Sequence, residues 1–471
     1  FISGLSKISK MLRQCLVLSL VLSVAVGYHV PYQHQQYEEP RYPQQQHHQQ
    51  YQQFAQYSAS NGKYDYDEVN VMELIQQYGY EAENHTVQTT DGYKLDLIRI
   101  PRGRQDKRVD QYYQGSSESS EEQSQQQQQQ QQKKQQYKHN SASQSSESNS
   151  NELPRRPPVL LMPGIISSAD DFVLGGPESG LAFILADRGF DVFLGSVRGS
   201  KYGRKHTTLD PDRDGLFWNF CMDDMAIKDL PETIDRILVI TRESRIRYLG
   251  HMQGAALFYA MASEMPRYND KVRIMVTLGP LAFLGRTNNL MVKEIRDNMD
   301  SKGWVVRHLG THVLKPSEEL ISKGGGDDCS RRVDDQSLCR NMYFLLNGYE
   351  SKLLNTTSCK PIIEDTRVSG RVSVKEMLQL GYWAQTGRFT KHCRGTDDYN
   401  LSKVTTPIVM FNTHDDMMST DMDVKELVEN LSGMKRFISY AELTNNLDLL
   451  FGNRIDEIAY DSVIRALSEM Y

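Results

Sequence analysis

Residues 246–260, which read IRYLGHMQGAALFYA, decide the fold of this chain. An apolar strand leads into Gly250-His251-Met252-Gln253-Gly254, and a helix-forming run follows. This is the arrangement of the G-x-S-x-G nucleophile elbow, in which a serine sits on a tight turn between a strand and a helix. Here the serine position is Met252, whose thioether carries no acidic proton and is only a weak acceptor. The stretch therefore predicts an elbow without a nucleophile.

The length and net charge of the chain limit the number of domains and the classes of partner to be expected. The chain has 471 residues, enough for one large domain with additional segments. Its formal net charge of −6 gives no reason to expect a nucleic-acid partner. Hydrophobic residues make up 39% of the chain, which is low for a purely globular protein, and the polar excess is concentrated in two segments.

The amino-terminal segment indicates secretion. Residues 1–10 read as translated upstream sequence, and residues 11–27 read as a signal peptide, with a basic start, an apolar run and small residues at its end. The apolar run is too short to span a bilayer, so we expect no membrane span and an extracellular location. Secretion makes the Asn-x-Ser/Thr motifs candidate glycosylation sites, at Asn84, Asn355, Asn400 and Asn430.

Two low-complexity segments are expected to be disordered. Residues 28–62 are rich in Gln and Tyr, and residues 104–154 are rich in Ser and Gln. Neither has enough apolar residues to offset the chain entropy lost on folding. The Ser-x-Glu spacing in the second segment offers candidate phosphorylation sites; the alternative is a solvated linker without modification. These sites are Ser116, Ser119, Ser120 and Ser145.

The cysteines of a secreted chain are candidates for disulfides. Cys329, Cys339, Cys359 and Cys393 cluster in one region, which favours one or two disulfides there with the connectivity left open. Cys221 lies among aromatic residues and is expected to be a buried free thiol. No C-x-x-C or H-E-x-x-H pattern indicates a metal, and no cofactor is expected.

The rest of the chain alternates strand and helix patterns. Continuous apolar strands between amphipathic helices favour a parallel sheet covered on both faces, the α/β class. Residues 280–400 interrupt the alternation with a mostly helical stretch, expected to be a cap over the carboxyl edge of the sheet. Strands are expected at 85–89, 94–100, 159–162, 191–194, 245–249, 272–278, 407–411 and 436–438, and helices at 69–78, 181–188, 222–239, 255–260, 423–431 and 457–470.

Several motifs in this order resemble the acid lipases of the gastric and lysosomal type, a branch of the α/β-hydrolase fold. They include Tyr78-Gly79-Tyr80, Asp91-Gly92-Tyr93, Val197-Arg198-Gly199-Ser200, Tyr248 to Gly254 and Asn446-Leu447-Asp448. The resemblance covers about residues 67–103 and 156–471. It implies a lipase-like domain that starts at 67–103, continues over 155–471 with its cap, and carries the 104–154 segment as an insertion.

The resemblance also implies where a catalytic triad would lie. The nucleophile position is Met252, the acid aligns best with Asp416, and the family's H-L-D motif reads Asn446-Leu447-Asp448, so Asn446 replaces the base. The backbone donors of the oxyanion hole would be Ile165 and Gln253. Two of the three catalytic groups are therefore missing, since asparagine cannot act as a base near neutral pH.

Two histidines lie near the implied site in the sequence, and neither is expected to act in catalysis. His251 stands beside a serine in active family members, and is therefore expected to be structural. His414 is close in sequence to Asp416 but has no hydroxyl partner at position 252. We therefore expect no intact catalytic group at this site.

Three functions remain open. The first is a secreted, catalytically inactive storage protein, because a lipase-like domain with serine-rich blocks resembles the egg-specific proteins (yolk polypeptide 2) of moths; this implies storage in yolk granules, with other yolk proteins or the chain itself as partners. The second is a lipid-binding pseudoenzyme that holds a lipid or fatty acyl chain. The third is an active triacylglycerol or ester lipase with an atypical site.

Overall fold

The structure is a computed structural model that describes residues 70–104, 156–332, 337–349, 351–364, 370–440, 443 and 445–469. The expected signal peptide, the 28–62 segment, almost all of the 104–154 insertion and the four candidate phosphoserines lie outside the described residues. Helices able to span a membrane are absent from the described ranges.

A mixed sheet forms the centre of the fold. The order of its main strands is β1-β2-β4-β3-β6-β7-β8-β9, and β5 pairs with β2. β1 and β2, and β2 and β4, are antiparallel, whereas all pairs from β4 to β9 are parallel. The strands are β1 Glu83–Gln88, β2 Tyr93–Ile100, β3 Pro158–Met162, β4 Asp191–Leu194, β5 Lys205–His206, β6 Ile246–His251, β7 Val272–Leu278, β8 Ile408–Thr413 and β9 Lys435–Tyr440.

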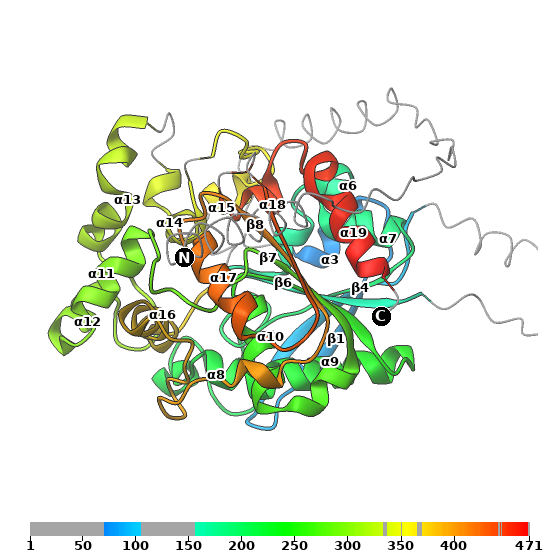
Figure 1. Cartoon of the computed structure of the whole chain (residues 1–471), viewed down its shortest axis with the longest axis horizontal. Coiled ribbons are helices and arrows are strands. Elements are labelled where there is room, and N and C mark those ends of the chain that lie inside the picture. Colours follow the sequence, from blue (N-terminus) through cyan, green and yellow to red (C-terminus); the bar gives the residue numbers. More distant parts are fainter. Residues whose placement is uncertain are drawn as a thin grey trace, which may run out of the picture. The chain divides into compact units, whose positions relative to one another are not determined.

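Helices cover both faces of this sheet, which confirms the expected α/β class. Figure 1 shows α9 and α10 on one side of the strands and α7 and α19 on the other. β3, β4 and β6 are buried along their whole length, as the continuous apolar runs predict for strands covered twice. The helices of this part are α3 Val71–Gln77, α6 Gly176–Ser179, α7 Leu181–Asp187, α8 Met222–Asp224, α9 Leu230–Thr241, α10 Gln253–Glu264, α17 Asp421–Asn430, α18 Asp448–Phe451 and α19 Asp461–Ser468.

The helix expected over 222–239 is broken into three pieces. α8 is followed by a π-helical turn, Met225–Asp229, and only then by α9. Pro231 lies in the first turn of α9 and has no N–H to donate to the carbonyl four residues earlier, so the ordinary helical ladder is interrupted there.

Between β7 and β8 the chain is mostly helical. α16 has the clearest ends: Ser373 and Glu376 form a capping box, and Gly387 ends the helix in the left-handed conformation. α11 packs against both α13 and α16, and Figure 1 shows these helices together beside the sheet. The helices are α11 Leu290–Asn298, α12 Lys302–His308, α13 Glu318–Arg332, α14 Met342–Asn347, α15 Lys360–Glu364 and α16 Val374–Thr386.

The cysteines correct one prediction. Cys221 is not a free thiol, because it forms a disulfide with Cys393. Asp223 explains the pairing: its Oδ2 accepts hydrogen bonds from the backbone N–H groups of residues 392–394, which holds that loop against the start of α8. Cys339 is also disulfide-bonded, whereas Cys359 is buried and free.

Candidate active site at the elbow

The turn between β6 and α10 has elbow geometry around a methionine. Met252 has φ 41° and ψ −99°, a positive-φ conformation that side-chain-bearing residues rarely adopt. Its N–H donates to the Leu278 carbonyl at 3.0 Å, which ties the turn to β7. Strain of this kind costs on the order of 1–3 kcal/mol and persists only where the surroundings impose it.

The two glycines of the motif allow the close approach that the turn requires. A Cβ on Gly250 would lie 2.6 Å from the Ala255 nitrogen, and one on Gly254 would lie 2.5 Å from the Met162 carbonyl oxygen. The Gly254 N–H also donates to the Pro163 carbonyl at 3.1 Å. The elbow is therefore packed directly against the end of β3.

The structure brings Met252 and Asn446 together although 193 residues separate them in the sequence. Both side chains meet at Gly279, where an added Cβ would lie 2.9 Å from Asn446 Cβ and 3.4 Å from Met252 Cγ. Both residues are 1% exposed. The nucleophile and base positions implied by the sequence thus share one buried site.

Asn446 binds the histidine of the elbow. Its Oδ1 lies 3.1 Å from His251 Nε2, and an amide oxygen can only accept, so Nε2 carries the proton in this pair. Burial lowers the pKa of His251 to about 4, which keeps the ring neutral near neutral pH. Among the described residues, His251 Nδ1 has no hydrogen-bond partner, and it faces Gly164, where an added Cβ would lie 2.7 Å away.

Asp416 completes the group. Its Oδ1 accepts from the backbone N–H groups of Met418 at 2.7 Å and Ser419 at 3.0 Å. Burial raises the pKa of Asp416 to about 6, although these two donors and the Asn446 side chain favour the charged form. Oδ2 has no hydrogen-bond partner of ordinary geometry in the part of the chain that the structure describes. The Asn446 side chain lies close to this carboxyl and lowers its pKa, but less than burial raises it.

The sequence is similar to those of known proteins with an α/β-hydrolase fold. Residues 71–176 match the partial α/β-hydrolase lipase region, and residues 157–303 match the α/β hydrolase fold. Among similar proteins, Lipase 3 of Drosophila melanogaster is 28% identical over 84% of this chain and 92% of its own. Gastric triacylglycerol lipase of Bos taurus is 27% identical over 85% of this chain and 91% of its own.

The chain has the α/β-hydrolase fold, and its sequence is similar to those of gastric triacylglycerol lipases. The α/β-hydrolase fold expected from the sequence motifs is thus confirmed, and the similarity to lipases extends over most of the chain. Lipase 1 of Drosophila melanogaster, 27% identical over 85% of this chain and 80% of its own, adds a second insect relative.

The two positions that the lipase resemblance implies for the oxyanion hole lie beside the elbow. Ile165 is fully buried behind Gly164, and Gln253 is the first residue of α10. The Gln253 side chain is buried, and its Nε2 donates to Glu376 Oε1 at 2.9 Å. Glu376 is buried on α16, and burial raises its pKa to about 7. The elbow is therefore linked to a helix of the 280–400 region.

Sequence reasoning missed the Glu376 contact. The Ser373-x-x-Glu376 spacing could have revealed a capping box, which the structure contains. Nothing in the sequence pairs this carboxylate with Gln253, because 122 residues lie between them.

The remaining polar side chains near the site are occupied elsewhere. His414 is exposed and its Nδ1 lies 3.1 Å from Asp421 Oδ2, so it does not join Asp416. The hydroxyls of Ser167 and Ser168, just after the oxyanion loop, donate to the carboxylates of Asp171 and Asp170. These groups are therefore bonded to carboxylates outside the pair formed by Met252 and Asn446.

The described residues contain one cluster with metal-ligand spacing, formed by Cys221, Asp224 and Cys393. Both sulfurs belong to the disulfide, so this cluster does not offer thiolates to a metal.

The candidate glycosylation sites differ in accessibility: Asn84, Asn400 and Asn430 are exposed, and Asn355 is half-buried. The Asn430 amide donates to the Glu426 carbonyl at 2.8 Å.

Proposed function

We propose that this chain is a catalytically inactive relative of the acid lipases. The observation that carries the proposal is the pair Met252 and Asn446, which meet at Gly279 in the positions of nucleophile and base. A thioether cannot attack an ester as a deprotonated hydroxyl does, and an amide cannot accept the proton. An oxyanion hole alone retains roughly 10³–10⁴ of rate over water, whereas loss of the triad costs roughly 10⁶.

Within that proposal, storage is the role we favour. The chain combines the lipase-like domain with long Gln-, Ser- and Glu-rich segments, a combination that resembles the moth egg-specific proteins. We infer secretion from residues 11–27, deposition in egg yolk, and later proteolysis as a source of amino acids. The polar 104–154 segment has the composition of a readily cleaved site.

A lipid carrier is the second candidate, and one specific observation favours it. A cavity of about 340 Å³ is lined mostly by apolar residues, nearly all of them from the segment between β7 and β8. Apolar lining rather than a triad gives affinity for an acyl chain, and this volume is within the range of small-molecule sites.

Hydrolysis assays on purified protein test the inactive state. We expect no turnover of short-chain or long-chain esters between pH 4 and 8. Turnover at ordinary lipase rates that copurifies with the chain through every step would contradict the proposal and support an active lipase with an atypical site. Lipid extraction of protein from its natural source then separates the two roles, because a carrier retains lipid stoichiometrically.

A further inference from the structure

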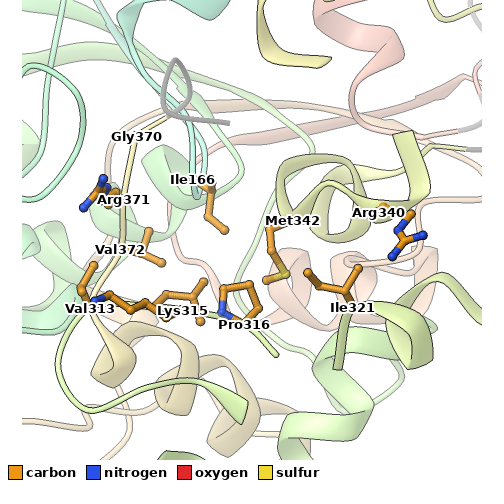
Figure 2. Close-up of a pocket in the computed structure, with 11 residues that line it drawn as sticks. Ile166, Val313, Lys315, Pro316, Ile321, Arg340, Met342, Gly370, Arg371 and Val372 are labelled. Carbon is orange, nitrogen blue, oxygen red and sulfur yellow. The ribbon is translucent and has the colours of Figure 1, made fainter. Parts of the chain in front are cut away.

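The cavity combines an apolar interior with a basic rim. Seven of its lining residues are apolar, and the charged ones are all cations: Lys315, Arg340 and Arg371. Figure 2 shows Arg371 at one end of the row of apolar side chains and Arg340 at the other. The full lining is Ile166, Val313, Leu314, Lys315, Pro316, Ile321, Arg340, Met342, Gly370, Arg371 and Val372.

The walls of this cavity are fixed by backbone contacts. The Leu314 N–H donates to the Val372 carbonyl at 3.0 Å, and Val313 forms a bridge with Ser373. Ile166 enters from the loop after β3 with φ 52°, and Met342 from α14. Main-chain hydrogen bonds therefore hold two of the segments that line the cavity in place.

The cavity is separate from the degenerate triad. Neither Met252 nor Asn446 lines it, and Ile166 is the lining residue nearest in sequence to the oxyanion position. A ligand there would not need the reaction centre. This matters because the site can retain a binding role after loss of catalysis.

Two of the three cations are available to a ligand. Arg340 is already paired with Glu318, at 3.0 Å between Nη2 and Oε2. Lys315 and Arg371 are both exposed, and within the described ranges neither has a carboxylate at ion-pair distance. An uncompensated positive rim beside an apolar interior attracts a ligand with a negative head and an apolar tail.

We infer that this cavity binds an anionic amphiphile, a long-chain carboxylate, with its chain against Ile166, Met342 and Val372 and its head group between Lys315 and Arg371. The inference rests on the proposed function in its lipid-binding form. It gives the ligand a charge that a neutral ester lacks, and it places the ligand away from Met252.

Calorimetric titration with dodecanoate tests the inference on the full chain. We expect one equivalent to bind, with affinity that falls as salt is raised, because the rim is exposed. 1-Dodecanol should bind at least several-fold more weakly, and dodecyltrimethylammonium should not bind. Equal affinity for the acid and the alcohol would overturn the assignment of an anionic head group.

Matched variants assign the site. K315E/R371E should lower the affinity for dodecanoate at least about tenfold, since two attractions become repulsions. K403E/K425E changes net charge equally at exposed positions outside the cavity and should change the affinity less than about twofold. V313W, which fills the apolar interior, should abolish binding. Equal losses in both double variants would overturn the location.

The two proposals fail separately. Absence of dodecanoate binding in a chain that also hydrolyses no ester overturns this inference and leaves the inactive state standing. Ester turnover by the unmodified chain overturns the inactive state, whatever binds in the cavity.

Discussion

Asn446 holds the elbow histidine through a hydrogen bond of 3.1 Å between its Oδ1 and His251 Nε2. The same side chain lies close enough to Asp416 to favour the charged form of that carboxyl. Asn446 therefore occupies the space between acid and elbow that a catalytic histidine would fill, but it cannot take up a proton. On the proposed function, the packing of an active site has been kept without its nucleophile and base.

The strained elbow predicts an unusual order of stability for two variants. Alanine normally stabilises a chain relative to glycine by roughly 0.5–1 kcal/mol. At φ 41° the order should invert, so M252G should be more stable than M252A by about 1 kcal/mol, although both lose the buried thioether. Urea unfolding of the two proteins measures the difference. An M252A protein as stable as M252G would show that residue 252 does not have a positive φ.

Asp416 predicts a stability difference that depends on pH. Its pKa is raised from 3.8 to about 6 by burial, so its contribution is fully present below about pH 4 and is lost as pH rises through 6. D416N keeps an oxygen that can accept from Met418 and Ser419 and has no charge to bury. Its stability relative to the unmodified chain should improve from pH 4 to pH 7, by on the order of 3 kcal/mol.

Other groups change in both proteins and cancel in that comparison. Asp171 and Glu376 also have raised pKa values, each about 7, so their contributions to stability are lost as pH rises. The pKa of His251 is lowered to about 4, so its contribution to stability is lost as pH falls. If the difference in unfolding free energy between D416N and the unmodified chain stays constant over pH 4–7, the pKa of Asp416 is not raised by burial.

The disulfide between Cys221 and Cys393 predicts a large loss of stability when it is removed. It closes a loop with a sequence separation of 172 residues, and loops of this length give roughly 3–5 kcal/mol. C221S/C393S should therefore unfold at lower denaturant concentration than the unmodified chain. C359S, which removes a buried free thiol, is the control and should cost less. Alkylation of Cys221 in the native, unreduced protein would disprove the pairing.

The elbow could be predicted because its signal is local. A strand, two glycines and a helix within fifteen residues place Met252 on a turn whichever way the distant parts fold. The parallel sheet could also be predicted, from the apolar runs of β3, β4 and β6. A continuous apolar run indicates a buried strand whichever strands it pairs with. The position of Asn446 came from the family pattern, not from physical chemistry.

Long-range pairings could not be predicted. The bond between Cys221 and Cys393 depends on Asp223 binding the 392–394 backbone, and sequence spacing carries no record of that contact. The aromatic neighbours of Cys221 favoured a core thiol, and they are indeed buried, but burial does not exclude a disulfide. The link between Gln253 and Glu376 was hidden for the same reason.

The double variant M252S/N446H tests the central claim most directly, that the scaffold of an ester hydrolase is intact around two lost groups. M252S alone should remain inactive, because His251 Nε2 is engaged by Asn446 and its pKa is about 4. N446H alone lacks a nucleophile. Together they restore nucleophile, base and Asp416, and hydrolysis of a short-chain p-nitrophenyl ester should rise at least roughly 10²-fold over either single variant. A folded double variant with no more activity than the single variants would contradict the account.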